Sequence, residues 1–286
     1  MSRTPFIAAC AQMRSGVDPA ANINQAAGLI REAAAAGASY VQTPEMSNAV
    51  NRDRNGLFAS IAPEGRDPML AAFQGLAREL GIHIHAGSLA ILRDDGKIAN
   101  RAFLIAPTGE IEARYDKVHL FDVDLPNGES WRESRTYTGG DSAVLADLPG
   151  GRLGLSICYD VRFPYLYRAL AEAGADFLSA PACFTRQTGE AHWVVLHRAR
   201  AIETGSFMIS AAQAGLHEDG RETFGHSIIV DPWGRVLAEA GDQPGVIMAE
   251  IDPALVADAR GRIPTLQHTR TFRVELAGAA PRARTA

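Results

Sequence analysis

The alternation of short apolar runs with amphipathic stretches is the feature that most constrains the fold of this chain. Apolar runs of about four to eight residues predict buried strands, and longer stretches with helical spacing predict helices. The order strand, helix, strand, helix, strand occurs twice, at residues 6–12, 19–36, 40–43, 68–80 and 82–88, and again at residues 153–158, 163–173, 177–180, 189–203 and 207–213. Two such units predict an α/β protein with two sheets packed face to face and helices outside, although a single doubly wound sheet fits the same pattern.

The rest of the chain predicts further strands and one short helix. Strands are expected at residues 100–106, 110–118, 225–231, 236–239 and 246–251, and a short helix is expected after Pro253. No low-complexity linker divides the chain, so we expect one domain over residues 1–276. The tail, residues 277–286, contains Pro281 and alternating Ala and Arg, and we expect it to be mobile.

One of the three cysteines stands where a predicted strand gives way to a predicted helix. Cys158 ends the strand at 153–158, and Pro164 lies in the first turn of the following helix. A thiol at this place lies near the positive end of a helix and near free backbone N–H groups, which favour the nucleophilic thiolate. Cys158 is therefore a candidate nucleophile, with a buried structural cysteine as the alternative. Cys10 is expected in the core, and Cys183 in a loop or a pocket wall.

Lysine is rare in this chain. Of the 28 basic residues, only Lys97 and Lys117 are lysine, and the others are arginine. Lys97 lies in a hairpin turn and is expected to be solvated. Lys117 lies at the end of a predicted strand, and its compact ammonium with a tunable pKa differs in kind from the planar fork of arginine. We interpret Lys117 as a functional candidate, with an incidental surface lysine as the alternative.

Glu45 completes a set of three candidates. It follows the predicted strand at 40–43 and Pro44, so it projects from the carboxyl end of a strand, where open α/β sheets place their chemistry. Taken alone it could be a solvated loop residue. Together with Lys117 and Cys158, in the segments 43–45, 115–122 and 156–164, it resembles the Glu–Lys–Cys triad of the nitrilase-type carbon–nitrogen hydrolases.

The resemblance runs from about residue 8 to residue 270 and is closest in character to the Nit-type amidases, the branch that holds deaminated glutathione amidase and ω-amidase. It implies a four-layer α-β-β-α sandwich. It also implies that Glu133 is a second, substrate-side glutamate; Glu129 lies nearby but fits that motif less well. One segment departs from the pattern, because residues 46–51 read Met-Ser-Asn-Ala-Val-Asn where Nit-type amidases more often place aromatic residues. This loop is expected to line the pocket.

The resemblance further implies a mechanism. Cys158 attacks an amide carbonyl, while Glu45 takes the thiol proton and later returns a proton to the leaving group. Lys117 and the backbone N–H of Tyr159 stabilise the oxyanion, and Glu133 positions substrate and water. A thioester intermediate is then hydrolysed by water that Glu45 activates. No metal or other cofactor is expected.

The expected substrate is a small primary amide that carries a carboxylate, hydrolysed to the acid and ammonia. Arg162 is expected to bind that carboxylate through its fork; the alternative is an ion pair with Asp160 or another acid. By the resemblance, Phe184 and Thr188 shape the pocket. An α-keto acid amide or deaminated glutathione would fit.

Three alternatives stay open at this point. The substrate could be another carbon–nitrogen compound, such as a nitrile or an N-carbamoyl compound. The chain could be a Cys–His hydrolase with His119 or His192 as the base. It could also be a binding protein that keeps the fold without the activity.

Charge and patterning exclude other classes of partner. A net charge of −5 gives no footprint for nucleic acid or an anionic membrane. No apolar run approaches the roughly 18 residues of a membrane span, and the amino terminus lacks the layout of a signal peptide. The cysteines have neither zinc-like nor redox spacing, so we expect a cytoplasmic protein. The family resemblance implies at least a homodimer, with contributions from the helix after Phe163 and from residues 263–268.

Overall fold

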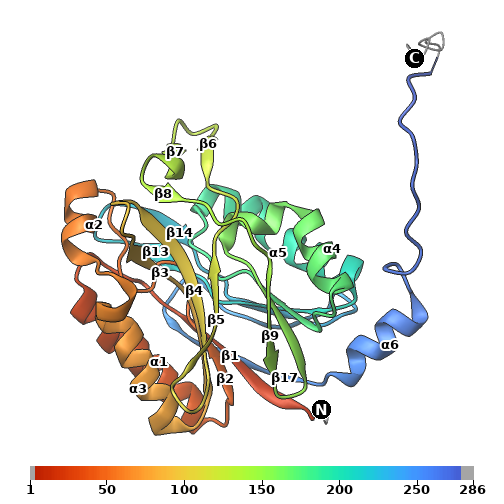
Figure 1. The fold of residues 1–286 in the computed structure, drawn as a ribbon, viewed down its shortest axis with the longest axis horizontal. Helices are drawn as coiled ribbons and strands as arrows, with labels where there is room; N and C mark the ends of the chain where they lie inside the picture. Colours follow the sequence, from red (N-terminus) through yellow and green to blue (C-terminus); the bar gives the residue numbers. More distant parts are fainter. Residues whose placement is uncertain (1–3, 278–286) are drawn as a thin grey trace.

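Two large β-sheets pack face to face, and helices cover their outer faces, in the computed structural model of this chain, which describes residues 4–277 (Figure 1). This arrangement is the four-layer α-β-β-α sandwich that the family resemblance implied. The single doubly wound sheet, which the alternation of elements had left open, is excluded.

The first sheet has the strand order β17-β1-β2-β3-β4-β5, and β8 pairs with β4. Its strands are β1 (Phe6–Gln12), β2 (Tyr40–Gln42), β3 (His83–Leu92), β4 (Ile98–Ile105), β5 (Ile111–Asp116), β8 (Tyr137–Thr138) and β17 (Gly245–Ile251). Strands β1, β2 and β3 are parallel, whereas β17, β4 and β5 are antiparallel to their neighbours. Helices α1 (Pro19–Ala35) and α3 (Pro68–Leu80) pack on its outer face.

The second sheet has the order β16-β15-β12-β11-β10-β9. Its strands are β9 (Val144–Leu148), β10 (Gly151–Leu155), β11 (Phe177–Ser179), β12 (Phe207–Ser210), β15 (Ile228–Val230) and β16 (Val236–Glu239). Helices α4 (Pro164–Glu172) and α5 (Arg186–Thr204) pack on its outer face. Two further α-helices are α2 (Arg54–Ser60) and α6 (Ala254–Arg262). Two short hairpins pair β6 (Asp122–Asp124) with β7 (Ser130–Arg132), and β13 (Ala214–Leu216) with β14 (Glu222–Phe224). The 3₁₀ helices are η1 (Glu64–Arg66), η2 (Glu133–Arg135) and η3 (Cys158–Arg162).

The period-2 alternation of strand side chains separates two hydrophobic cores. Ala8 and Cys10 of β1 face the second sheet and share a core with its strands, while Ala9 and Ala11 face α1 and α3. All four side chains are buried. A strand that is buried on both faces has no polar side, which explains why its sequence reads as a continuous apolar run. The expectation that Cys10 lies in the core is confirmed.

Local sequence signals set the limits of the long helices. Asp67 caps α3 by accepting a hydrogen bond from the N–H of Leu70 at 2.8 Å, and Pro68 occupies the first helical position. Gly81 ends α3 in the left-handed conformation, with φ of 68°, as its place after the last apolar residue predicted. Asp18 caps α1 in the same way, through the N–H of Ala20.

The structure corrects several sequence predictions. Residues 54–60, within a predicted loop, form α2, and the predicted strands at 207–213 and 225–231 contain shorter strands. Strand β9 was not predicted. The last strand, β17, pairs with β1 in the first sheet, although it follows the second-sheet strands in the chain. Of the tail predicted to be mobile, all but residue 277 lies outside the described residues, and the single domain over residues 1–276 stays a prediction.

One end of the sandwich collects the functional candidates. Glu45 follows β2 and Lys117 follows β5, whereas Cys158 and Cys183 follow β10 and β11 of the other sheet. Because these strand ends meet at the same end of the sandwich, residues that lie far apart in sequence converge there.

Candidate active site

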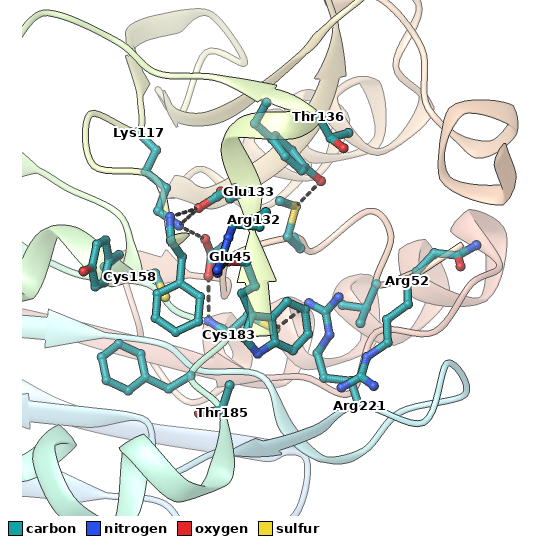
Figure 2. A pocket seen from close by; sticks show the side chains of 18 of the residues that line it. Glu45, Arg52, Lys117, Arg132, Glu133, Thr136, Cys158, Cys183, Thr185 and Arg221 are labelled. Atoms are coloured by element: carbon teal, nitrogen blue, oxygen red, sulfur yellow. Dashed lines mark hydrogen bonds and ion pairs between the residues drawn. The ribbon is translucent and has the colours of Figure 1, made fainter. Parts of the chain in front are cut away.

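Glu45, Lys117 and Cys158 line a single cavity of about 440 Å³ (Figure 2). Their side chains are almost fully buried, with exposed fractions of 3% for Glu45, 2% for Lys117 and 6% for Cys158. Solvent therefore screens their charges weakly, and each charge must be balanced within the site.

The ammonium of Lys117 is held between two carboxylates. Its Nζ lies 2.9 Å from Oε1 of Glu45 and 2.9 Å from Oε2 of Glu133. A protonated lysine has three N–H donors, so two are used by these carboxylates and one remains. Figure 2 shows all three side chains pointing toward one another beside Cys158.

Three donors fix the carboxylate of Glu45. Besides Lys117, its Oε1 accepts a hydrogen bond from Nδ2 of Asn100 at 2.9 Å, and its Oε2 accepts one from the backbone N–H of Cys183 at 2.8 Å. The Cys158 thiol lines the same cavity, where burial and the charge of Glu45 raise the pKa of that thiol. A carboxylate with these partners is oriented toward the thiol.

Asn100 ties the two glutamates together. Its Nδ2 also contacts Oε1 of Glu133 at 3.1 Å, and Glu133 accepts a further hydrogen bond from the N–H of Phe121 at 2.7 Å. Asn100 was missed by the sequence analysis. The available signal was an asparagine inside the apolar strand at 100–106, because strands are depleted in asparagine and a buried one needs partners.

The charges of the triad determine its protonation. Burial alone would raise the pKa of Glu45, but the charge of Lys117 and the hydrogen bonds to the carboxylate hold that pKa below its ordinary value. Burial opposes the charge of Lys117, yet Glu133 and Glu45 raise the pKa of its ammonium well above the usual range. The resting site therefore contains carboxylate and ammonium at neutral pH.

Opposing influences set the pKa of Cys158. Burial, and then the negative charge of Glu45, raise the pKa of the Cys158 thiol well above its ordinary value, although Lys117 lowers it in part. The helix end and the free N–H groups that favour a thiolate at this turn are outweighed by burial and by the charge of Glu45. The free site holds a thiol beside a base.

The backbone at Cys158 lies in a conformation that side chains rarely adopt. Within residues 4–277, positive φ angles outside glycine occur at Met46 (57°), Cys158 (49°) and His226 (56°). Two of these three positions are at the site, since Met46 directly follows Glu45. Such strained positions concentrate at functional sites, where the surrounding structure holds them in place.

Asp160 locks the turn that presents Cys158. Its carboxylate accepts hydrogen bonds from the Tyr115 hydroxyl at 2.7 Å and from the N–H groups of Ile157 at 2.8 Å and His119 at 3.0 Å. The His119 ring is also bonded to Asp160 and to the Tyr165 hydroxyl. His119 does not line the cavity, so it is occupied elsewhere and the Cys–His alternative based on it has no support.

The cavity is also lined by the other predicted site residues, Tyr159, Arg162, Phe184 and Thr188. The guanidinium of Arg162 lies 5.2 Å from the ring centroid of Phe184 and donates to Nδ1 of His192 at 3.0 Å. Among residues 4–277 it makes no ion pair, so the alternative of a structural pair with Asp160 is excluded. His192, the other base proposed for a Cys–His enzyme, is thus a partner of Arg162. Thr188 is bonded to the Thr185 hydroxyl at 2.9 Å.

The far wall of the cavity contains residues that the sequence analysis did not single out. These residues are Arg52, Trp131 and Arg221. The loop at residues 46–51 also lines the cavity, as predicted, through Met46, Ala49, Val50 and Asn51. Glu129 also lines the cavity, but its carboxylate accepts from Nε1 of Trp131 at 3.3 Å and makes no contact with Lys117. Cys183 lies in the cavity wall, as expected.

Two further kinds of feature are absent from residues 4–277. No group of three or more His, Cys, Asp or Glu side chains is arranged to hold a metal ion. In the same part of the chain, no helix is both long and apolar enough to span a membrane.

Comparison with known proteins identifies the family. The family model for carbon–nitrogen hydrolases matches residues 7–261. The deaminated glutathione amidase of Synechocystis sp. is 42% identical over 272 residues, which cover 92% of this chain and 98% of that protein. The crystal structure of the NitFhit protein of C. elegans superposes with a TM-score of 0.88 at 35% identity, over 94% of this chain and 66% of that longer one.

A third comparison bears on the chemistry. A variant of the amidase from Nesterenkonia sp. AN1, whose structure shows Michael addition of acrylamide at its active-site cysteine, has 26% identity and a TM-score of 0.75, over 91% of this chain and 98% of that one. The chain belongs to the carbon–nitrogen hydrolase family. It is an amide-hydrolysing enzyme of that family, as the resemblance predicted.

Proposed function

We propose that Cys158 is the nucleophile of this amidase, Glu45 its general base and Lys117 its oxyanion-binding cation. The observation that carries the proposal is the convergence of Glu45 and Cys158 in one buried cavity, with Nζ of Lys117 2.9 Å from the Glu45 carboxylate. A base within hydrogen-bonding reach of the nucleophile, itself oriented by a third group, is the arrangement that nucleophilic catalysis requires.

The reaction has two halves. The Cys158 thiol gives its proton to Glu45 while its sulfur bonds to the amide carbon, and the carbonyl oxygen takes up negative charge. The free third N–H of Lys117 and the Tyr159 N–H, which belongs to the first turn of η3 and has no partner within that helix, bind this oxygen. The carbon–nitrogen bond then breaks, and the proton on Glu45 passes to the leaving amine.

The second half restores the enzyme. Glu45 removes a proton from a water molecule as its oxygen bonds to the thioester carbon. The carbon–sulfur bond breaks, the acid leaves and the proton returns to the Cys158 sulfur. Glu133 acts as a positioning residue, because its contacts with Lys117 and Asn100 hold the ammonium in place.

The proposed substrate is a small amide that carries a carboxylate, such as an α-keto acid amide or deaminated glutathione. The name of the Synechocystis relative supports this class. The guanidinium of Arg162 supports it too, because it lines the cavity without a carboxylate partner among residues 4–277. Phe184 and Thr188 complete this side of the substrate site.

The nucleophile is tested by substitution and mass spectrometry. We expect Cys158→Ala to abolish amide hydrolysis while the fold remains, and we expect the wild type to show an acyl adduct on the peptide that contains Cys158. Cys183→Ala is the matched control, since the contact of Cys183 with Glu45 is made by its backbone N–H. Substantial product release by purified Cys158→Ala would refute the mechanism.

A substrate screen tests the class of compound. Amides, nitriles and N-carbamoyl compounds are offered to the purified enzyme, and the released ammonia or amine is measured. We expect carboxylated amides to be turned over fastest. Faster turnover of nitriles would move the chain to another activity within the family.

We also propose a homodimer in the cytoplasm, built from one domain per chain and with no nucleic-acid or membrane partner. Support for the dimer comes from apolar side chains exposed on α4, on α5 and after α6, namely Tyr165, Val195 and Ile263. Exposed apolar side chains gathered on neighbouring elements are typical of protein–protein contacts.

A further inference from the structure

A buried asparagine lies between the two glutamates of the site. Asn100 is the third residue of β4, and the alternation of that strand turns it, like Ala102 and Leu104, toward the second sheet. Its side chain is fully buried, and it is not among the residues that line the cavity. Any effect of Asn100 on the reaction must therefore pass through the side chains that it contacts.

Asn100 and Lys117 join the two carboxylates into a closed ring of hydrogen bonds. Nδ2 of Asn100 lies 2.9 Å from Oε1 of Glu45 and 3.1 Å from Oε1 of Glu133. Nζ of Lys117 lies 2.9 Å from Oε1 of Glu45 and 2.9 Å from Oε2 of Glu133. The backbone carbonyl of Asn100 also accepts a hydrogen bond from the N–H of Lys117 at 3.0 Å. Asn100 thus holds the lysine by its main chain and both glutamates by its side chain.

The contacts of Asn100 fix the orientation of its amide. With Nδ2 toward the carboxylates, its two N–H bonds serve one glutamate each, whereas the reverse orientation would place a carbonyl oxygen against two carboxylate oxygens. This orientation leaves Oδ1 buried without a hydrogen-bond partner among residues 4–277. A buried acceptor without a partner lowers stability, so its presence indicates that the two donated bonds are what the site requires.

The contacts of Glu45 leave one acceptor position open. A carboxylate has about four such positions, two on each oxygen. Lys117 and Asn100 occupy both positions on Oε1, and the backbone N–H of Cys183 occupies one on Oε2 at 2.8 Å. The remaining position is on Oε2. A proton taken up by Glu45 therefore goes to Oε2, because a proton on Oε1 would displace one of the two donors.

We propose that Asn100 is a positioning residue for proton transfer. With Lys117 it closes Oε1 of Glu45, so that Oε2 is the atom that takes the proton from Cys158 and passes it to the leaving amine. Asn100 itself neither gains nor loses a proton. This inference rests on the proposed function, because it takes Glu45 as the base, and it adds the reacting atom and the residue that selects it.

Loss of Asn100 should change the pH dependence of the reaction. Burial raises the pKa of Glu45, while the charge of Lys117 and hydrogen bonds that include the one from Asn100 hold that pKa below its ordinary value. Without this bond the pKa of Glu45 rises, so a higher pH is needed to ionise the base. The other titratable groups around Glu45 remain in the variant, namely Lys117, Glu133, Tyr137, Cys158 and Cys183, with Arg221 beyond Cys183.

Steady-state kinetics across the pH range test the inference, with deaminated glutathione as the substrate and the released amine as the readout. In Asn100→Leu, which removes the donors at similar size, we expect the acidic limb of kcat/KM to move up by about 1 pH unit. We expect kcat at pH 7 to fall by about 10- to 100-fold, the scale of a hydrogen bond to a charged group, because Glu45 is held less firmly. KM should stay within about threefold, because Asn100 does not line the cavity.

Asn48→Leu is the matched control for the loss of a buried asparagine. Asn48 lies near Glu45 in the chain and is also buried, but its Nδ2 contacts the carboxylate of Asp67 at 3.2 Å and neither glutamate of the site. Its loss should lower the midpoint of urea denaturation without moving the acidic limb. An equal shift of the limb in Asn48→Leu and Asn100→Leu would overturn the inference.

The remaining outcomes separate two kinds of failure. A folded Asn100→Leu variant that keeps the acidic limb of the wild type overturns this inference and leaves Glu45 as the base. A wild type that is inactive on every amide overturns the proposed function itself. If Asn100→Leu does not fold, Asn100→Ser decides the matter, because a hydroxyl has one donor and cannot bridge two carboxylates. The same upward shift is expected there, and an unchanged limb would overturn the inference.

Discussion

At the scale of single residues, Lys117 explains why this arginine-rich chain keeps a lysine in its core. Its Nζ fits between Glu45 and Glu133 at 2.9 Å from each and retains one donor for the substrate. A guanidinium is wider and planar, so it cannot place one N–H toward each carboxylate and a third toward the oxyanion from the same point. The identity of this residue therefore follows from geometry and not from charge alone.

Replacing Lys117 by arginine tests this reading. We expect Lys117→Arg to lower kcat by at least about 100-fold, the scale of one lost oxyanion contact. Steady-state kinetics on a carboxylated amide measure the effect, and circular dichroism establishes that the variant is folded. Lys97→Arg is the matched control, because Lys97 is an exposed turn residue. A Lys117→Arg enzyme within threefold of the wild type would remove the lysine from the mechanism.

At the scale of elements, the site depends on how the end of β5 is joined to η3. Asp160 in η3 accepts hydrogen bonds from the Tyr115 hydroxyl and the His119 N–H, which flank Lys117, and from Ile157, which precedes Cys158. One buried carboxylate thus fixes the distance between the lysine and the nucleophile, although these residues come from different sheets.

Removing this carboxylate should loosen the site and the fold together. We expect Asp160→Ala to lower the free energy of unfolding by about 3–5 kcal/mol, because it leaves several buried donors unsatisfied. Urea denaturation measures this change, and kcat should fall as well because Cys158 is no longer held. Tyr115→Phe, which removes one hydrogen bond to the same carboxylate, should cost only about 1 kcal/mol. Equal effects of the two changes would mean that Asp160 is not the central link.

At the scale of the whole molecule, the four layers bury histidines that carry no charge. Burial lowers the pKa of His85 to about 3 and that of His197 to about 4, from an ordinary value of 6.5. At a pH between the lowered pKa of each histidine and 6.5, the unfolded chain binds more protons than the folded chain. The free energy of unfolding therefore falls as the pH drops below 6.5. At pH 5 each of these two histidines contributes a loss of about 2 kcal/mol.

Urea denaturation at pH 7 and at pH 5 checks this sign and size. We expect lower stability at pH 5, and a smaller difference between the two pH values in His197→Gln. His268→Gln is the control, because His268 is exposed and should leave the pH dependence as it is. Stability that is constant or higher at pH 5 would contradict the prediction.

Assembly is a second property at this scale. We expect light scattering to give about twice the monomer mass of 30.6 kDa, because Tyr165, Val195 and Ile263 expose apolar surface on the outer side of the second sheet's helices and beyond α6. Val195→Glu should shift the protein toward the monomer by placing a charge in that contact. Leu216→Glu, an equally exposed position in the β13–β14 hairpin, should not. A wild-type mass near the monomer at micromolar concentration would rule out the dimer.

The sequence alone determined the local parts of this protein. Apolar periodicity placed most strands and helices within a few residues, and Asp67, Pro68 and Gly81 set the limits of α3 because capping depends on neighbouring residues only. The family motifs identified Glu45, Lys117 and Cys158, which the structure brings into one cavity. Pairing of β17 with β1 could not be read from the chain, since strand pairing is non-local and several edges accept the same apolar strand.

Only the tertiary structure decided the electrostatics and the outer part of the site. From its place before a helix, Cys158 was expected to feel influences that favour a thiolate, whereas burial and the nearby Glu45 raise the pKa of its thiol and outweigh them. The sequence offered no reason to group Asn100 with Glu45, or Arg221 with Trp131, because each pair comes from distant segments. A pKa depends on every charge and every shielded surface within several ångströms, and those neighbours exist only after the chain has folded.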